Sequence, residues 1–329
     1  MSEVPWAGEL RDRLTRVLGT EVAIERMQLL AGGASKEAWA LDARTPAGTV
    51  ELLVRRALGG VIHDDTLSLE HEYRVLSNAF DAGVAVPEPH GYLEELDGRE
   101  AFVMARVRGE TIGRRIVQRP ELEGARAALP GQMAAQLAKI HALPAERLPF
   151  LPGVGAGVDL LARLTRELDA VGEPHPAIEL GLAWLRERLP RRRAPVVNHG
   201  DFRVGNLAVD GEGLVSVLDW EFAHIGDPAE DLAWPLVRAW RFGADGRRLG
   251  GIGEVEPYLE RYNELAGLDI DLAELAVWEI LGNVKWAIGA LTQSRRHLHG
   301  RERSVELAVL GRLAAEMELE LLDLLERAA

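Results

Sequence analysis

The spacing of apolar residues changes character near residue 107, and this change restricts the fold more than any other feature of the chain. One helical pattern, with its apolar positions between Leu69 and Phe80, interrupts the residues before that point. The rest of that part carries short β-type runs, at 22–30, 37–41, 50–55, 90–93 and 101–105. After that point, helical patterns cover about 122–142, 157–171, 176–189, 228–241, 255–266, 271–297 and 301–327.

This division predicts an α+β fold with two lobes. We expect a small β-rich N-terminal lobe in residues 1–106 and a larger, mainly helical C-terminal lobe in residues 107–329. Ligand sites often lie where two parts of a protein meet, so we expect the site at the junction of the lobes.

The composition excludes several classes of protein. Apolar residues make up 47% and charged residues 27% of the 329-residue chain, as in globular proteins. The net charge of −14 makes nucleic acid and anionic membranes poor partners. The sequence has no cysteine, no signal-peptide pattern at its start and no apolar stretch near the roughly 20 residues that cross a bilayer. We therefore expect a cytoplasmic enzyme that binds neither nucleic acid nor a membrane.

The richest motif is the run at 198–206, which reads Asn-His-Gly-Asp-Phe-Arg-Val-Gly-Asn. Directly after it, two apolar runs flank Asp-Gly-Glu-Gly at 210–213, which is a strong hairpin signal. Asn206 opens the first strand and Asp219 closes the second, so both side chains should reach one small volume. A carboxylate and an amide oxygen suit Mg²⁺, which takes its remaining ligands from water and phosphates. Asp201, just before the hairpin, is placed to accept a proton from a substrate hydroxyl.

Three features of the N-terminal lobe fit phosphate binding. Residues 31–35 read Ala-Gly-Gly-Ala-Ser, and glycine lets a backbone approach phosphate closely, although most such pairs are plain turns. Arg55 ends a strand where its cation could reach phosphate oxygens, although a surface position is the common alternative. Glu72 should border the packed face of the helical pattern and orient Arg55, whereas Glu70 should point outward.

Other polar residues are better explained by structure. Asp227 precedes a Pro-Ala-Glu run, which predicts a helix with Asp227 as its N-cap. Asp231, in the first turn of that helix, could brace the 198–206 loop. We interpret His141 as a structural histidine and assign no partner to His224. We expect a helical stripe to belong to the core, formed by Trp278, Leu281, Val284, Ile288 and Leu291.

On these motifs the chain resembles the aminoglycoside phosphotransferase-like family of the protein-kinase-like superfamily. It is most similar there to bacterial phosphotransferases that are like the kinase domains fused to some acyl-CoA dehydrogenases. Asn206 follows Asp201 by five residues, and Asp219 follows Asn206 by thirteen, as in kinase-like catalytic loops. The matching motifs span nearly the whole chain, at 32–35, 53–56, 72–76, 86–89, 102–104, 199–201, 218–221 and 226–228.

The resemblance implies the two-lobe protein-kinase-like fold and a role for each residue of the central motif. Asp201 would be the catalytic base, or the group that orients the acceptor hydroxyl. Arg203 would neutralise charge on the moving phosphoryl group. Asn206 and Asp219 would bind Mg²⁺.

The resemblance also implies ATP as the nucleotide, bound mainly by the N-terminal lobe. Residues 32–35 would cover the phosphates, and Arg55 would contact the α- and β-phosphates while it pairs with Glu72. Backbone groups at 105–107 would receive adenine. The residues implied in nucleotide binding are Gly32, Gly33, Ala34, Ser35, Arg55, Glu72, Met104, Ala105 and Val107.

Two departures from protein kinases matter. Arg55 stands where those enzymes carry lysine, and its planar fork can contact a phosphate and Glu72 together. We do not expect Lys36 to replace it, because Lys36 directly follows the glycine-rich loop. Asp219 is followed by Trp-Glu, and the chain has no activation segment of the Ala-Pro-Glu type. A protein substrate is therefore not expected.

The expected reaction is transfer of the γ-phosphoryl group of Mg·ATP to a hydroxyl of a small molecule. We rank a metabolic alcohol or hydroxyacyl compound first, for which apolar residues in 148–161 are candidate contacts, and an aminoglycoside-type antibiotic second. The alternative is a non-catalytic, nucleotide-binding pseudokinase or scaffold, which the intact Asp201, Asn206 and Asp219 disfavour. An antibiotic would need clustered carboxylates, for which the candidates are Glu167, Asp169, Glu173, Glu230 and Glu254.

Overall fold

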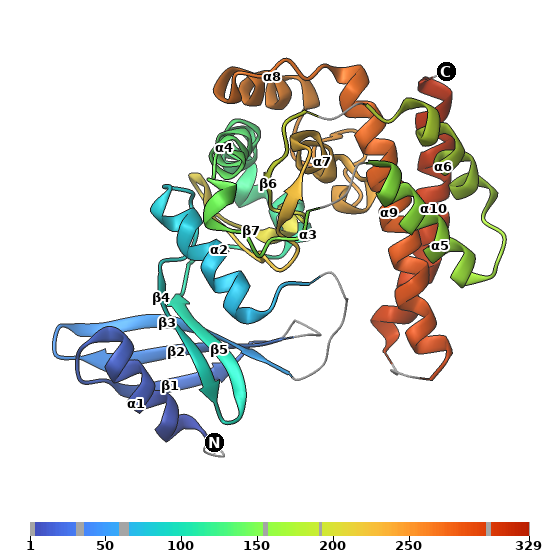
Figure 1. Ribbon diagram of the computed structural model, residues 1–329. Helices are drawn as coiled ribbons and strands as arrows, with labels where there is room; N and C mark the ends of the chain where they lie inside the picture. Colours follow the sequence, from blue (N-terminus) through green and yellow to red (C-terminus); the bar gives the residue numbers. More distant parts are fainter. Residues whose placement is uncertain are drawn as a thin grey trace.

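The computed structural model describes residues 4–30, 36–58, 66–153, 157–190, 193–300 and 304–328. Figure 1 shows a sheet-containing N-terminal part and a mainly helical C-terminal part. The first carries α1 (Ala7–Leu18), β1 (Ala23–Leu29), β2 (Lys36–Thr45), β3 (Gly48–Ala57), α2 (Leu69–Asp81), β4 (Pro89–Leu96) and β5 (Arg99–Ala105). The second carries α3 (Gly113–Gln118), α4 (Glu123–His141), α5 (Gly157–Val171), α6 (Pro176–Arg188), β6 (Val196–Asn198), β7 (Leu207–Asp210), β8 (Gly213–Val217), β9 (His224–Gly226), α7 (Pro228–Ala233), α8 (Val255–Ala266), α9 (Leu272–Leu298) and α10 (Val305–Arg327).

The N-terminal strands form one antiparallel sheet in the order β1-β2-β3-β5-β4. Successive side chains on a strand point to opposite faces, so the two faces have different neighbours. On β5, Val103 joins a small core with Leu10 and Leu14 of α1, whereas Phe102 joins the main core with α2. Helices α1 and α2 therefore cover opposite faces of the sheet.

Helix α2 lies between the sheet and the helical part (Figure 1) and is attached to the latter at both ends. Before the helix, the N–H of Leu67 donates to the carbonyl of Glu221 at 2.8 Å. After it, the N–H of Ala85 donates to Gln136 Oε1 of α4 at 2.8 Å, and its carbonyl accepts from Val217 N–H at 2.7 Å. The buried apolar face of α2 packs in the main core through Leu69, Val75, Leu76 and Ala79.

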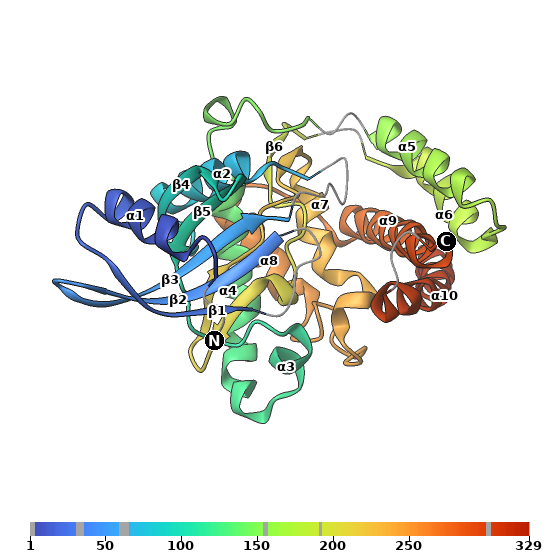
Figure 2. The ribbon, with the colours of Figure 1, turned by 90° about the horizontal axis from the view of Figure 1, so that it is seen from below.

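The C-terminal part is built around α9. Figure 2 shows α9 and α10 side by side, and α9 also contacts α5, α6 and α7. The stripe Trp278, Leu281, Val284, Ile288 and Leu291 is buried, which confirms its assignment to the core. Among the described residues, no helix is long and apolar enough to cross a membrane.

Most expected elements are present, but one expected helix is wrong. Instead of a helix over 228–241, α7 ends at Ala233 and two 3-10 turns follow, at Trp234–Leu236 and Arg238–Arg241. Pro235 has no N–H to continue the helix, and Phe242 turns the chain with a φ of +48°. Elements that we did not expect are α1, α3 and the two-stranded sheet of β6 and β9.

A buried ion cluster joins this irregular segment to the last two helices. Arg241, which is 4% exposed, contacts Glu279 Oε1 of α9 at 3.1 Å and Glu320 Oε1 of α10 at 2.8 Å. Arg248 also pairs with Glu279, and Arg238 lies 3.2 Å from Glu320 Oε2. Burial raises the pKa of Glu279, and the two arginines oppose that rise. Arg241 therefore neutralises two carboxylates that have little access to water.

We expect Arg241→Met to lower the free energy of unfolding by about 3 kcal/mol, because it removes the cation that two buried carboxylates share and leaves each of them with one partly exposed arginine. Arg261→Met is the matched control, since Arg261 and Glu264 form an exposed pair on α8. The control should change stability by less than about 1 kcal/mol. Urea unfolding of both variants measures the difference, and equal effects would contradict the assignment.

Candidate functional site

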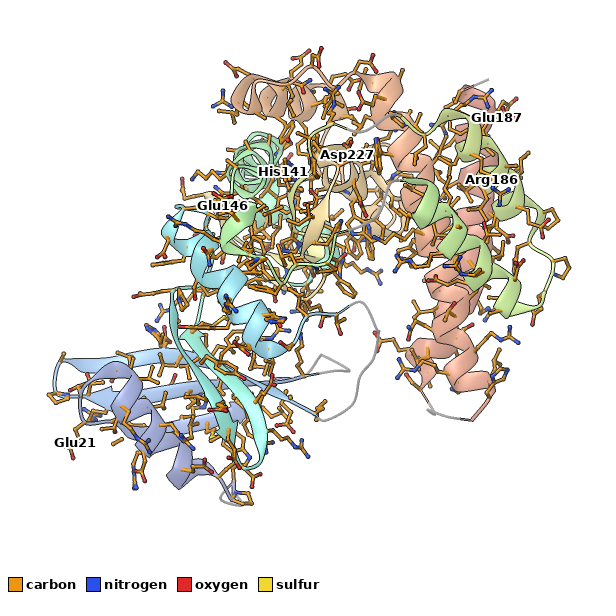
Figure 3. The ribbon with its side chains drawn as sticks, in the orientation of Figure 1. Glu21, His141, Glu146, Arg186, Glu187 and Asp227 are labelled. Carbon is orange, nitrogen blue, oxygen red and sulfur yellow. The ribbon has the colours of Figure 1, made fainter. Side chains whose placement is uncertain are left out.

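The carboxylate of Asp231 holds the turn that begins the 198–206 loop. Its two oxygens accept the backbone N–H of His199 at 2.5 Å and of Gly200 at 2.9 Å. His141 at the end of α4 (Figure 3) lies 3.4 Å from Asp231, and its other ring nitrogen lies 2.7 Å from the hydroxyl of Tyr262. The brace by Asp231 and the structural role of His141 are therefore confirmed. Asp227 (Figure 3) also caps α7 as expected, by accepting the N–H two residues later.

Three side chains fix the orientation of Asp201. Arg203 Nε lies 3.0 Å and 3.1 Å from its two carboxylate oxygens. Trp234 Nε1 donates to Oδ1 at 2.6 Å, and Asn206 Nδ2 donates to Oδ2 at 2.5 Å. Arg203 in turn lies over the ring of Trp240, with 4.3 Å from its guanidinium carbon to the ring centroid. Asp201 is thus held in one position at the edge of an aromatic surface.

The hairpin of β7 and β8 brings Asn206 and Asp219 to the same end, as expected. Leu207 pairs with Val217, and the N–H of Leu218 donates to the carbonyl of Asn206 at 2.8 Å. Asp219 follows immediately and has a φ of +67°, a left-handed conformation that aspartate tolerates better than most residues. The backbone turns sharply there, directly beyond the strand.

His199 connects the two halves of this motif, a role that we did not derive from the sequence. Its Nδ1 accepts the N–H of Asp201 at 3.2 Å, and its Nε2 lies 3.0 Å from the carbonyl of Leu218. A carbonyl only accepts, so Nε2 carries the proton. Burial lowers the pKa of His199, although nearby carboxylates oppose the shift, and the imidazole is therefore neutral. The neutral ring ties the loop to the hairpin.

A cluster of charged side chains lies where α2, β2 and β3 meet the end of the hairpin. Arg55 Nη1 lies 2.7 Å from Glu72 Oε1, so the expected ion pair is present, and Arg55 Nη2 lies 3.0 Å from Asp219 Oδ1. Glu72 is 1% exposed, whereas the side chain of Glu70 is 51% exposed, as expected. Arg55 therefore links α2 to the hairpin.

Lys36 also takes part in this cluster, a contact that we did not expect from its position directly after the glycine-rich loop. Its Nζ lies 2.6 Å from Glu72 Oε2 and 2.9 Å from Glu221 Oε2. The cause is strand register: β2 and β3 are antiparallel, with Ala38 opposite Arg55, and Lys36 is two residues from Ala38. Lys36 and Arg55 therefore point to the same face of the sheet.

Opposite charges determine the ionisation of this cluster. Burial alone would raise the pKa of Asp219, but the charge of Arg55 holds it below its ordinary value. Burial would lower the pKa of Arg55, but the charges of Glu72 and Asp219 raise it. Burial and the neighbouring Asp219 raise the pKa of Glu221, while Lys36 opposes the rise. The cluster holds two cations and three carboxylates, which leaves it receptive to a cation.

The donor chemistry of Asn206 and Asp219 fits Mg²⁺. Asn206 uses its amide nitrogen for Asp201, and Asp219 uses Oδ1 for Arg55. The amide oxygen of Asn206 and Oδ2 of Asp219 are then the available donors. In the described part of the chain, no group of three or more histidine, aspartate or glutamate side chains could hold a metal alone. An ion here would complete its shell from water and phosphates, as Mg²⁺ does.

The other expected nucleotide contacts are only partly described. Gly32, Gly33, Ala34 and Ser35 lie outside the described residues. Met104 is buried at the end of β5, where the N–H of Ala105 donates to the carbonyl of Glu88 at 2.8 Å. Val107 lies two residues beyond the strand and is half-buried.

Several of the candidate acceptor contacts are engaged elsewhere in the structure. Most of the apolar side chains in 148–161 are buried in the main core, so they do not line an open groove; these are Leu148, Leu151, Leu160 and Leu161. The side chain of Glu230 is only 11% exposed and lies 3.2 Å from His224 and 3.1 Å from Lys285. These two cations hold the pKa of Glu230 well below its ordinary value, although burial alone would raise it. Glu230 is therefore an internal ion-pair partner, and it is the partner of His224.

Gly200 has a φ of +81°, and a Cβ there would lie 2.2 Å from the carbonyl oxygen of Phe222. We expect Gly200→Ala to lower the free energy of unfolding by about 1–3 kcal/mol, because both strain and collision with backbone oppose it. Gly211→Ala, at the hairpin turn with open space around its Cβ position, is the matched control. Chemical denaturation measures both variants, and the control should change the free energy of unfolding by less than about 0.5 kcal/mol. A tolerated Gly200→Ala would show that this turn is not constrained.

A sequence profile of the phosphotransferase enzyme family matches residues 26–278. Acyl-CoA dehydrogenase family member 10 of Mus musculus is 26% identical over 294 residues, which cover 81% of this chain and 26% of the relative. Acyl-CoA dehydrogenase family member 11 of Homo sapiens is 27% identical over 270 residues, which cover 77% of this chain and 34% of the relative. The chain thus spans about a quarter to a third of the length of these relatives.

Solved structures share the fold. A Ralstonia eutropha protein, provisionally named an aminoglycoside phosphotransferase, superposes with a TM-score of 0.76 at 20% identity, covering 98% of this chain and 99% of that one. A spectinomycin phosphotransferase in complex with ADP and spectinomycin gives a TM-score of 0.64 at 14% identity, covering 95% of this chain and 98% of that one. The chain therefore belongs to the phosphotransferase enzyme family and has a two-lobe, protein-kinase-like fold.

Proposed function

We propose that this protein transfers the γ-phosphoryl group of Mg·ATP to a hydroxyl group of a small molecule. The observation that carries the proposal is the arrangement around Asp201. Its carboxylate is fixed by Arg203, Trp234 and Asn206, next to the hairpin end that bears Asp219. A hydroxyl aligner, a cation and two oxygen ligands are the groups that phosphoryl transfer requires from a protein.

In this proposal Asp201 aligns the acceptor hydroxyl and accepts its proton as the bond to phosphorus forms. Phosphoryl transfer passes through a loose transition state, so alignment and charge neutralisation are the main tasks of the protein. Arg203, already beside Asp201, neutralises charge on the transferred group. Asn206 and Asp219 hold Mg²⁺, which when bound supplies positive charge to the phosphate oxygens.

The N-terminal lobe, residues 1–106, binds the nucleotide in the same proposal. Arg55 contacts the α- and β-phosphates, and residues 32–35 cover them. The N–H of Ala105 is already bonded to Glu88, and the N–H of Arg106 donates to the carbonyl of Glu51 at 3.0 Å. The amide of Val107 and the carbonyl of Ala105 are therefore the backbone groups assigned to the adenine edge. Complexes of structural relatives contain ADP in one case and GDP in another.

The surroundings of Asp201 favour a metabolic alcohol or hydroxyacyl compound over an aminoglycoside. Trp234, Trp240 and Trp286 form a chain of ring contacts that starts at Asp201. Two cations lie on these rings: Arg203 on Trp240, and Lys285 over Trp234 at 5.2 Å. A polycationic antibiotic needs unpaired carboxylates, whereas Asp201 and Glu230 are already paired with these two cations and the rings offer apolar surface.

The proposal is tested by ADP release from Mg·ATP across a panel of acceptors. The panel holds aminoglycosides, macrolides, choline, sugars, hydroxy acids and hydroxyacyl thioesters. Release that requires one acceptor class supports the kinase and identifies its substrate. Nucleotide binding without release for any acceptor favours the alternative, a non-catalytic nucleotide-binding scaffold.

We expect Asp201→Asn to lower turnover by about 10²–10⁴-fold, because the amide no longer accepts the hydroxyl proton. Nucleotide binding should stay close to that of the wild type, since Asp201 does not contact the nucleotide in this arrangement. Steady-state kinetics and calorimetric titration with Mg·ADP measure the two quantities. Turnover close to the wild-type value would remove Asp201 from the role of base.

We expect Asp219→Ala to raise the Mg²⁺ concentration for half-maximal turnover by about tenfold or more, because one of two protein ligands is lost. Asp210→Ala serves as control, since Asp210 lies at the exposed far end of the same hairpin. A Mg²⁺ titration at fixed nucleotide measures the shift. An unchanged titration curve in Asp219→Ala would exclude it from the metal site.

A further inference from the structure

Lys36 and Arg55 divide a single buried carboxylate between them. Glu72 Oε2 lies 2.6 Å from Lys36 Nζ, and Glu72 Oε1 lies 2.7 Å from Arg55 Nη1. Each cation also reaches the segment after β8, because Lys36 contacts Glu221 and Arg55 contacts Asp219. Two parallel ion bridges therefore join α2 to the end of the hairpin. Protein kinases, in contrast, have a single ion pair between one lysine and one glutamate.

The second bridge has a clear physical use. Both Nη atoms of Arg55 are engaged, with Glu72 and Asp219. A phosphate that recruits Arg55 must therefore draw its guanidinium away from one of these carboxylates. With Arg55 as its only partner, Glu72 would be left as an uncompensated charge at 1% exposure, at a cost of several kcal/mol. Lys36 removes that cost, because it stays on Glu72.

Lys36 is poorly placed to leave its carboxylate partners for a nucleotide phosphate. Its side chain is 9% exposed, and its Nζ is shared by two carboxylates within 3 Å. An ammonium group that moved to a phosphate would strand both of them. The geometry therefore separates the two cations, with Lys36 retained inside the protein and Arg55 nearer to solvent at 16% exposure.

We infer that Lys36 is a positioning residue, which holds α2 and the Asp219 segment together through Glu72 and Glu221 and so frees Arg55 for the nucleotide phosphates. The inference rests on the proposed nucleotide and Mg²⁺ site. Lys36 acts through Glu221 on the backbone that presents Asp219, and not on the nucleotide itself. Its loss should therefore weaken the Mg²⁺-dependent part of nucleotide binding.

The test is calorimetric titration of the full chain with ADP, with Mg²⁺ and with a chelator. In Lys36→Met, the gain in ADP affinity caused by Mg²⁺ should fall about tenfold relative to the wild type, as for other residues that orient metal ligands. Affinity for metal-free ADP should fall by a smaller factor, about threefold, because Arg55 is then the only remaining partner of Glu72 and is less free to contact the phosphates. A general loss of structure would lower both affinities together, so the ratio isolates positioning.

The chain offers a matched control variant and a second variant that weakens the same ion bridge. Lys139→Met removes another lysine, which donates to the carbonyl of Gly83 away from the cluster, and should leave the ratio unchanged. Glu221→Gln weakens the same bridge from its other end and should lower the ratio at least threefold. The double variant should be no worse than Lys36→Met alone, because both changes break one bridge.

The outcomes separate the two proposals. The positioning role would be overturned if Lys36→Met kept the wild-type gain in ADP affinity with Mg²⁺. It would also be overturned if the effects of Lys36→Met and Glu221→Gln on this gain multiplied in the double variant. Either result would leave the kinase proposal in place. If Lys36→Met does not fold, Glu221→Gln decides, and an unchanged ratio in it overturns the role. A wild-type chain that binds neither form of ADP would overturn both proposals.

Discussion

The buried carboxylate of Asp231 is the interaction on which the geometry of the site depends. Burial alone would raise its pKa, but hydrogen bonding to His141 and the charges around it hold the pKa below its ordinary value. The charge is kept because backbone N–H groups of His199 and Gly200 donate to it. Those donors belong to the turn that presents Asp201. A charge that is costly to bury thus specifies one loop conformation, and the rest of the loop is arranged from that point.

The second determinant is the cluster around Glu72, in which every charge has a partner on another element. Arg55 comes from β3, Lys36 from β2, and the carboxylates of Asp219 and Glu221 follow β8. Such a network stabilises little by itself, because the desolvation of the charges offsets their attraction. Its value lies in geometry, since only one relative placement of sheet, helix and hairpin satisfies all five side chains.

Local patterns of the sequence were sufficient for most of the elements and for the central motif. The α+β division, the hairpin that joins Asn206 to Asp219 and the N-cap Asp227 all depend on residues close in sequence. The contacts that were not foreseen depend on long-range register or on a break in regular structure. Lys36 reaches Glu72 only because β2 and β3 pair with Ala38 opposite Arg55. Trp234 reaches Asp201 from the segment where the expected helix 228–241 ends early. No spacing rule along the chain encodes either contact.

The anchoring of α2 has a consequence for control of activity. In protein kinases, the helix that bears the glutamate partner moves, and its position switches the enzyme on and off. Here hydrogen bonds before and after α2, from Leu67 and Ala85, attach it to the helical part, and its apolar face is buried there. Swinging the helix outward would break these bonds and expose that face to water. An outward swing of α2 would therefore require part of the main core to open, so the pairing of Glu72 with Arg55 is built into the packing of the fold.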